Sequence, residues 1–111
     1  MYTYSAVCTR VVDGDTIDVD VDLGFVVFTR ARLRFARINA PETRTRDLAE
    51  KERGYMAKDL IKSAIEGNDN KVRITTTEKG KYGRWIAEIY VGETNLSDLL
   101  LENGLAKLVE Y

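Results

Sequence analysis

The first third of the chain alternates between apolar and charged residues with a period of two, which is typical of strands with one buried face. Isoleucine and valine alternate with aspartate over residues 17–22, and alanine, leucine and phenylalanine alternate with arginine over residues 30–35. The pattern predicts strands over residues 4–12, 17–22 and 25–38, with turns at Asp13-Gly14 and Leu23-Gly24. Pro41 should end the third strand, because proline cannot donate a ladder hydrogen bond.

After Pro41 the spacing of the apolar residues changes from the period of a strand to that of a helix. Apolar residues recur at helical spacing over residues 48–66, and Gly67 suits the position after a helix C-terminus. The remainder predicts four pieces: strands over residues 71–78 and 84–91 joined by a turn at Lys79-Gly80-Lys81, a short helix over residues 97–102, and an extended piece over residues 105–109. Asn95 or Ser97 should cap the short helix, and Gly104 should stop it.

Three strands, a helix and two strands fit the five-stranded Greek-key OB barrel, whose surface commonly binds oligonucleotides. The expected fold class is α+β, mainly β, with one helix between strands three and four and a short helix near the C-terminus. A chain of 111 residues is long enough for one compact core, so we expect a single domain over residues 1–111.

Charge is balanced overall but uneven along the chain. The 17 basic and 18 acidic residues leave a net charge of −1, which argues against strong non-specific affinity for nucleic acid. Five aspartates lie within residues 13–22 and six arginines within residues 29–46, an arrangement that suits a cation held beside a phosphate. The alternative is a solvated strand face, which we favour for Arg30, Arg32 and Arg37.

The residue types that are missing exclude several chemistries. With no histidine, the usual neutral-pH base and most zinc sites are absent, so acid–base chemistry must use carboxylate, lysine, tyrosine or metal-bound water. Cys8 is the only cysteine, which excludes an internal disulfide, and we expect it to fill the core. No apolar run approaches the roughly 20 residues of a membrane span, and the N-terminus lacks the pattern of a secretory signal. We therefore expect a cytoplasmic location and no membrane partner.

Three motifs carry the candidate chemistry: Asp13-Gly14-Asp15-Thr16, then Arg34 followed by Asn39-Ala40-Pro41-Glu42-Thr43, then Lys81-Tyr82-Gly83-Arg84. They supply oxygens for a hard cation, a candidate general base and two guanidinium groups. Each motif alone has an ordinary interpretation as a turn, a loop glutamate or a surface cation. In this order and spacing, from about Val11 to Lys107, the chain resembles the staphylococcal nuclease (thermonuclease) family.

The resemblance implies a calcium site, or one for another divalent cation. Asp15 matches the first carboxylate ligand of the family, while Asp13 and Thr16 should fix the turn. Asn39 stands where the family has an aspartate ligand, and Ala40 would contribute its backbone carbonyl. Since an amide oxygen brings no negative charge, we expect calcium to bind more weakly by roughly one order of magnitude or more.

The resemblance also implies the remaining roles. Glu42 would be the general base or would position the attacking water. Arg34 and Arg84 would hold the phosphate and stabilise its added charge, because guanidinium is always charged and forks onto two oxygens. Lys81 and Tyr82 would lie beside the nucleotide and bind substrate by charge and stacking.

These residues and the resemblance together predict a calcium-dependent nuclease that acts on DNA or RNA, as an endonuclease. The resemblance further implies that cleavage leaves 3′-phosphate ends. One alternative is a catalytically weakened OB module that binds nucleic acid and in which Asn39 marks a decayed metal site. Another is a protein-interaction barrel, which the near-neutral charge would suit. The oligomeric state, monomer or homodimer, stays open.

Overall fold

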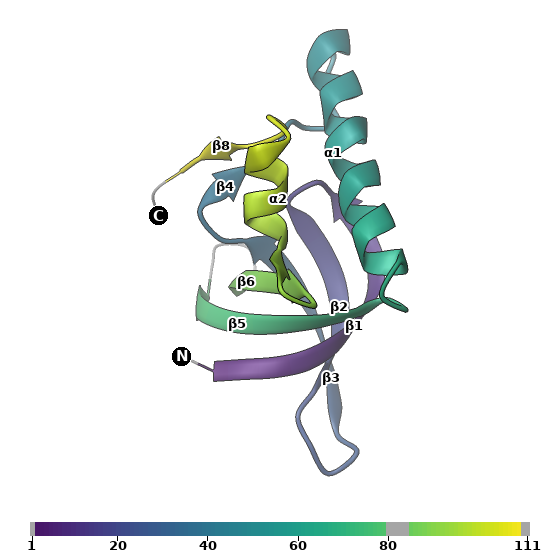
Figure 1. The fold of residues 1–111 in the computed structure, drawn as a ribbon, viewed down its shortest axis with the longest axis vertical. Helices are drawn as coiled ribbons and strands as arrows, with labels where there is room; N and C mark the ends of the chain where they lie inside the picture. The colour runs from purple at the N-terminus through teal and green to yellow at the C-terminus, as the bar shows by residue number, and fades with distance from the viewer. Residues whose placement is uncertain (1, 80–84, 110–111) are drawn as a thin grey trace.

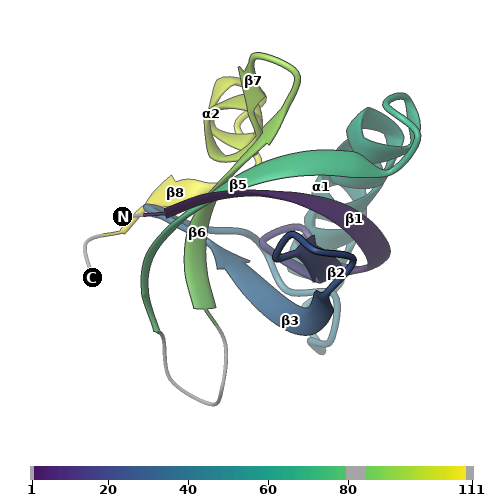
Figure 2. The same ribbon diagram turned by 90° about the horizontal axis from the view of Figure 1, so that it is seen from below.

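Five strands close into a barrel in the structure, a computed structural model that describes residues 2–79 and 85–109. The barrel strands are β1 (Tyr2–Asp13), β2 (Thr16–Asp22), β3 (Phe28–Phe35), β5 (Lys71–Lys79) and β6 (Trp85–Val91). They follow the order β3-β2-β1-β5-β6, and a parallel pairing of β3 with β6 closes the cylinder (Figure 1; Figure 2). The expected Greek-key OB barrel is therefore confirmed, with the long helix between the third and fourth barrel strands.

The strands bury the face that the alternating pattern predicts. Ile17 and Val19 of β2 have no solvent exposure, whereas Asp18 and Asp20 beside them stay partly exposed. Leu33 of β3 packs into the same core. The outer face of β2 and β3 is therefore the face that carries aspartates and arginines.

Helix α1 (Leu48–Glu66) has the bounds that the sequence predicts and packs against the barrel (Figure 1). Its N-terminus is capped by Asp47, whose Oδ1 accepts hydrogen bonds from the backbone of Ala49 at 3.0 Å and Glu50 at 3.3 Å. Gly67 is its C-cap, as expected. The buried residues recur every three or four positions and are Gly54, Ala57, Ile61 and Ile65. Two of these four are very small, which lets the helix lie close to its neighbours.

The short helix α2 (Leu96–Glu102) follows β7 (Thr94–Asn95). Of the two caps that the sequence allowed, Asn95 is the one used, because its Oδ1 accepts from the backbone N–H of Asp98 at 3.1 Å. Ser97 is buried and its hydroxyl donates instead to the carbonyl of Ala36 at 2.9 Å. This bond ties α2 to the end of β3.

The third strand is shorter than predicted. β3 covers Phe28–Phe35, whereas the pattern predicted one extended segment over residues 25–38. Phe25, Val26 and Arg37 have φ of 55°, 61° and 70°, so they lie in the left-handed region and interrupt the strand at both ends. The chain before β3 consequently forms a hairpin tip that projects from the barrel (Figure 1).

After this interruption the chain resumes as β4 (Ile38–Asn39), which pairs with β8 (Lys107–Leu108). The extended piece predicted over residues 105–109 is thus confirmed in part, and its partner is β4, which no pattern indicated. The pairing brings the last described strand beside the segment that leads into Pro41.

Neither helix in the described part of the chain is long and apolar enough to span a membrane.

Two smaller predictions concern single side chains. Cys8 lies in the core, and burial raises the pKa of its thiol, as expected for a core residue. Arg37 is exposed as predicted, but it also bridges two carboxylates, with Glu88 at 2.9 Å and Asp98 at 3.1 Å. The turn predicted at residues 79–81 falls largely outside the described residues.

Candidate functional site

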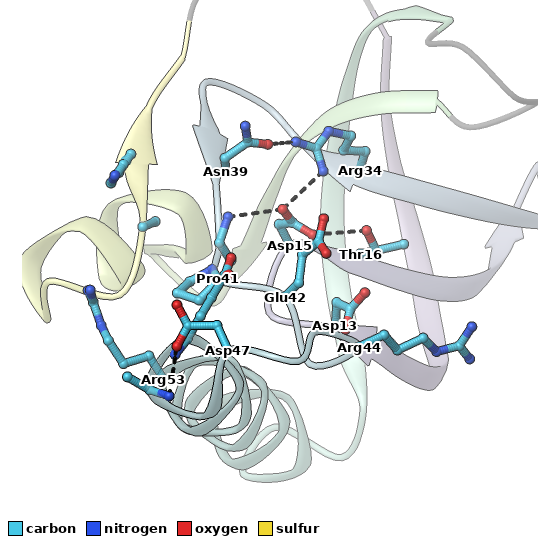
Figure 3. A pocket seen from close by; sticks show the side chains of 15 residues that line it. Asp13, Asp15, Thr16, Arg34, Asn39, Pro41, Glu42, Arg44, Asp47 and Arg53 are labelled. Carbon is cyan, nitrogen blue, oxygen red and sulfur yellow. Dashed lines mark hydrogen bonds and ion pairs between the residues drawn. The ribbon is translucent and has the colours of Figure 1, made fainter.

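An open cleft of about 980 Å³ lies where the turn between β1 and β2, strand β4 and the first turns of α1 come together (Figure 3). Five residues that the sequence singled out line it: Asp15, Arg34, Asn39, Ala40 and Glu42. They come from three separate parts of the chain, namely the turn at Asp15, strand β3 and residues 39–42, and only the closed barrel brings them to one place. The cleft is therefore the candidate functional site.

Asp15 lies at the floor of the cleft and is almost completely buried. The hydroxyl of Thr16 donates to its Oδ1 at 3.1 Å, and the backbone N–H of Ala40 donates to its Oδ2 at 3.0 Å. Its own carbonyl accepts from the backbone N–H of Phe35 at 2.8 Å. Thr16, which was expected to fix the turn, thus orients the carboxylate, and a buried carboxylate with this many donors has one preferred direction.

Arg34 reaches the same carboxylate from β3. Its Nη1 donates to Asp15 Oδ2 at 3.0 Å, and its Nη2 donates to Asn39 Oδ1 and, at 3.4 Å, to the carbonyl of Ile38. The β2–β3 register sets this geometry, since Arg34 lies opposite Thr16, the residue that follows Asp15. The two side chains predicted as cation ligands therefore point at one guanidinium (Figure 3).

This donor set fits a hard cation, but with little charge. Asp15 offers a carboxylate and Asn39 an amide oxygen, both of which calcium accepts as ligands. The contact that the structure shows for Ala40 is its backbone N–H donating to Asp15. The role of the Ala40 carbonyl as a cation ligand stays a prediction. Among the described residues no three acidic, histidine or cysteine side chains gather into a metal-binding group. A cation held here would depend on water or a bound phosphate for its remaining ligands.

Glu42 lines the cleft with an exposed side chain on a firmly held backbone. The next residue, Thr43, is buried, and its hydroxyl donates to Asp13 Oδ1 at 2.7 Å. Asp13 was expected to fix its own turn; the bond that its side chain accepts joins this turn to the loop that carries Glu42. The loop and the Asp15 turn are consequently joined by a direct side-chain bond.

Three cationic lining residues were missed by the sequence analysis as parts of the site: Arg44, Arg53 and Lys107. Arg53 lies on α1 and its guanidinium donates to the carbonyl of Gly104 at 2.5 Å. Its place in the second turn of a predicted helix was a usable signal, since that end of α1 follows Glu42 closely. Lys107 of β8 pairs with Asn39 of β4, and no local pattern could have revealed that pairing.

Opposite charges nearly cancel within the cleft. Its described lining residues hold five carboxylates and four cations, namely Asp13, Asp15, Glu42, Asp47 and Glu50 against Arg34, Arg44, Arg53 and Lys107. A phosphate entering this part of the cleft meets no net positive charge. A bound divalent cation would supply the missing attraction.

Three predicted residues lie outside the described part of the chain: Lys81, Tyr82 and Arg84. Trp85, the first described residue after them, pairs in parallel with Leu33, next to Arg34 in β3. The roles assigned to these three residues by resemblance stay predictions.

Known proteins match nearly all of this chain. A sequence model of the family described as "Staphylococcal nuclease homologue" matches residues 32–111. The thermonuclease of Staphylococcus hyicus is 30% identical over 109 residues, which are 98% of this chain and 60% of that protein. The thermonuclease of Staphylococcus intermedius is 28% identical over 102 residues, covering 92% of this chain and 58% of that protein.

A third relative is matched over only a small part of its own length. Endonuclease YhcR of Bacillus subtilis (strain 168) is 30% identical over 110 residues, which cover 93% of this chain but 9% of that protein. The chain thus spans about three fifths of the length of the two thermonucleases and a small part of the endonuclease.

Proposed function

The chain belongs to the staphylococcal nuclease family, and from that membership and its cleft we propose that it is a calcium-dependent nuclease that hydrolyses phosphodiester bonds of DNA or RNA. One observation carries the proposal: the Asp15 carboxylate, the Asn39 amide oxygen and the Arg34 guanidinium converge on one point of a cleft that Glu42 also lines. A phosphodiester requires charge neutralisation and an oriented water, and this set of groups can provide both.

Calcium, or another divalent cation, would be held by Asp15, Asn39 and the carbonyl of Ala40. When bound, it supplies charge neutralisation and a template for the phosphate. The nearly cancelled charges of the described lining residues support this requirement, because the protein groups there leave no surplus positive charge. The single carboxylate ligand favours a weak site.

Arg34 binds two oxygens of the scissile phosphate and stabilises the charge that develops on them. Its burial and its fixed partners keep the guanidinium in one orientation before substrate arrives. Arg84, from the segment outside the described residues, would provide the second guanidinium.

Glu42 orients a water for in-line attack and takes its proton. The water oxygen bonds to phosphorus, the bond from phosphorus to the 5′ oxygen breaks, and that oxygen takes a proton from solvent. The products are a 3′-phosphate end and a 5′-hydroxyl end. An internal bond is accessible because the cleft is open, which suits an endonuclease.

Neighbouring phosphates of the strand would lie along the cationic lining residues Arg44, Arg53 and Lys107, together with Lys81. Tyr82 would stack on a base or sugar. These contacts carry no base-specific hydrogen bonds, so we expect little sequence preference.

A second candidate function is a nucleic-acid-binding module without catalysis. The amide of Asn39 favours it, because this residue leaves the proposed metal site with one carboxylate. The persistence of Asp15, Arg34 and Glu42 in one cleft favours the enzyme instead.

The deciding experiment is cleavage of a fluorescent single-stranded DNA with millimolar calcium and with excess chelator. It compares the wild-type protein with Glu42→Gln and with Glu93→Gln, a matched change at an exposed glutamate away from the cleft. We expect calcium-dependent cutting that Glu42→Gln reduces to a small residual rate while DNA binding and Glu93→Gln activity persist. Absence of cutting with calcium, manganese or magnesium, together with salt-dependent DNA binding, would establish the binding module instead.

A further inference from the structure

Helix α1 approaches the backbone of the Glu42 loop more closely than any side chain would allow. Gly54 is a buried residue of α1, and a Cβ atom added to it would lie 2.5 Å from the carbonyl oxygen of Glu42 and 2.9 Å from that of Pro41. Glycine is unfavourable in a helix interior, because it loses more backbone freedom than other residues. The close approach to the loop is the physical reason for glycine at this position.

The other side of Glu42 is held by Thr43. The Thr43 side chain is buried and donates its hydrogen bond to Asp13 at the end of β1, at 2.7 Å. The backbone of Glu42 is thus held on both sides, while the Glu42 side chain itself is exposed to the cleft. The direction of this carboxylate consequently depends on where its backbone is placed.

The helix that makes the contact is itself fixed to the barrel. Ile61 of α1 has no solvent exposure and belongs to the barrel core. One turn after Gly54, Ala57 meets the turn before Asp15, where a Cβ on Gly14 would lie 2.7 Å from the Ala57 Cβ. One face of α1 therefore abuts both the loop of the proposed base and the turn of the proposed metal ligand.

We propose that Gly54 and Thr43 are positioning residues that hold the Glu42 carboxylate at the distance from the phosphate that the reaction needs. The inference rests on the proposed nuclease function, in which Glu42 acts on the attacking water. An ordinary van der Waals contact needs 3.4 Å or more, so a methyl group at residue 54 displaces the Glu42 backbone, which is 2.5 Å away. A misplacement of about 1 Å near reacting groups costs on the order of a hundredfold in rate.

Substrate and cation binding should respond differently from the rate. The contacts of Asp15, Arg34 and Asn39 with one another involve no atom of α1. Displacing the Glu42 backbone should therefore lower kcat much more than it changes the KM for DNA or the calcium dissociation constant, although the Ala40 carbonyl lies only two residues before Glu42. A general loss of folded protein would also lower the apparent kcat at unchanged KM, so the folded fraction is measured separately, by thermal melting and from the calorimetric stoichiometry of calcium binding.

The first test is Gly54→Ala, measured for kcat and KM on single-stranded DNA and for calcium affinity by calorimetry. We expect kcat to fall by about ten- to a hundredfold, with changes in KM and calcium affinity that are several-fold smaller. The matched control is Gly67→Ala at the other end of α1, where φ is −65° and the nearest non-neighbouring atom is 3.3 Å from the added Cβ. This control should leave kcat unchanged, and thermal melting reports the folded state of both.

The second variant is Thr43→Val, which keeps the side-chain shape and removes the hydroxyl. It tests the same proposal from the other side of Glu42 and serves alone if Gly54→Ala does not fold. We expect a lower kcat at unchanged KM, while Thr94→Val at an exposed strand position has no effect. In a Glu42→Gln background neither variant should lower the residual rate further, because both act through the missing carboxylate.

The outcomes separate this inference from the nuclease function. Unchanged kcat in both variants, with Glu42→Gln reduced to a small residual rate, overturns the inference and leaves the nuclease function standing. Further loss of that residual rate in either double variant does the same. If the wild-type protein cuts no nucleic acid, the nuclease function falls, and so does the catalytic part of the inference. The amide NMR signals of Glu42 and Thr43 then test the remainder: shifts in Gly54→Ala that Gly67→Ala lacks support a positioning role, and unshifted signals overturn it.

Discussion

The two ends of strand β3 carry the same kind of ion pair in different surroundings. Three arginines alternate along its outer face, and each binds an aspartate of β2 or of the turn before it. The pairs are Arg30–Asp20 at 3.1 Å, Arg32–Asp18 at 2.7 Å and Arg34–Asp15 at 3.0 Å. The exposed fraction of the arginine side chain falls along this series from 73% to 46% to 15%. Burial, and not distance, distinguishes the three pairs.

The difference shows what makes a charged residue useful for phosphate chemistry. Water screens the exposed pairs, which contribute little to stability. At the buried end the Arg34 guanidinium has lost most of its water and is held by Asp15, Asn39 and the carbonyl of Ile38. A desolvated, pre-oriented cation acts far more strongly on a developing phosphate charge than a solvated one.

The barrel itself creates the difference. β6 pairs with β3 only at residues 33–35, so the strand is enclosed at that end and projects as a hairpin at the other (Figure 1). Next to the enclosed end, β4 brings Asn39 and Ala40 over the Asp15 turn. Solvent therefore surrounds the Arg30 side chain at the hairpin end, whereas protein groups surround the Arg34 side chain at the enclosed end.

The largest effect should come from Arg34→Ala, compared with Arg32→Ala on the same strand. We expect kcat for DNA cleavage to fall by about two to three orders of magnitude for Arg34→Ala, because a preorganised donor to the phosphate is lost. Arg32→Ala should stay near wild type, since its partner Asp18 lies outside the cleft. Equal losses in the two variants would contradict the comparison.

Asn39→Asp should strengthen the buried end. A second carboxylate ligand should lower the calcium dissociation constant by roughly tenfold, as measured by calorimetry, because calcium affinity rises with ligand charge. Without calcium the new carboxylate accepts from Arg34, which Asp15 also binds, so one guanidinium then lies between two carboxylates. Asn70→Asp, an exposed residue in the turn after α1, is the control. Unchanged affinity would show that residue 39 is not a ligand.

Asp18→Asn probes the middle pair through its dependence on pH. The hydrogen bond from Arg32 lowers the pKa of Asp18 below its ordinary value of 3.8. A lowered pKa in the folded state means that the pair contributes stability above about pH 4 and loses it as the pH falls through the folded-state pKa. We expect Asp18→Asn to be less stable than wild type at pH 7 by under about 1 kcal/mol, since the pair is partly exposed. Denaturant melts from pH 7 to pH 2 should show the difference disappear; a constant difference would contradict it.

The smallest effect should come from Arg30→Ala at the most exposed pair. We expect its melting temperature and its kcat to match wild type within error, because solvent already satisfies both partners. Nucleic-acid affinity measured at low salt provides the sharper readout. A clear loss of affinity would show that the hairpin end of β3 also contacts the substrate, and would reduce the contrast between the two ends.

Much of the fold follows from local pattern. The bounds of α1 are correct because helical periodicity, a capping Asp47 and a terminal Gly67 agree over residues 48–66. The alternation over residues 17–22 also gives the buried face of β2 correctly. Both succeed because each element satisfies its own hydrogen bonds or faces one core, whatever the rest of the chain does.

The errors occur where distant segments override the pattern. Residues 25–27 are apolar and were predicted to belong to a strand. In the structure, Phe25 and Val26 have left-handed backbone conformations and lie in an exposed hairpin tip. The two-residue strand β4 and its pairing with β8 were not predicted, and Lys107 was therefore missed as a lining residue. Such short pairings have almost no local signal, since their stability comes from the closed barrel around them.

For the candidate site, alternation alone made Arg30, Arg32 and Arg34 equivalent, and family resemblance singled out Arg34. The sequence by itself determined the chemical groups, their order and the regular elements that carry them, because propensity and periodicity act over short stretches. Only the tertiary structure determined which arginine is desolvated and how closely Gly54 approaches the Glu42 loop. Burial and close approach are properties of surfaces that meet from distant parts of the chain, and no local stretch of residues contains them.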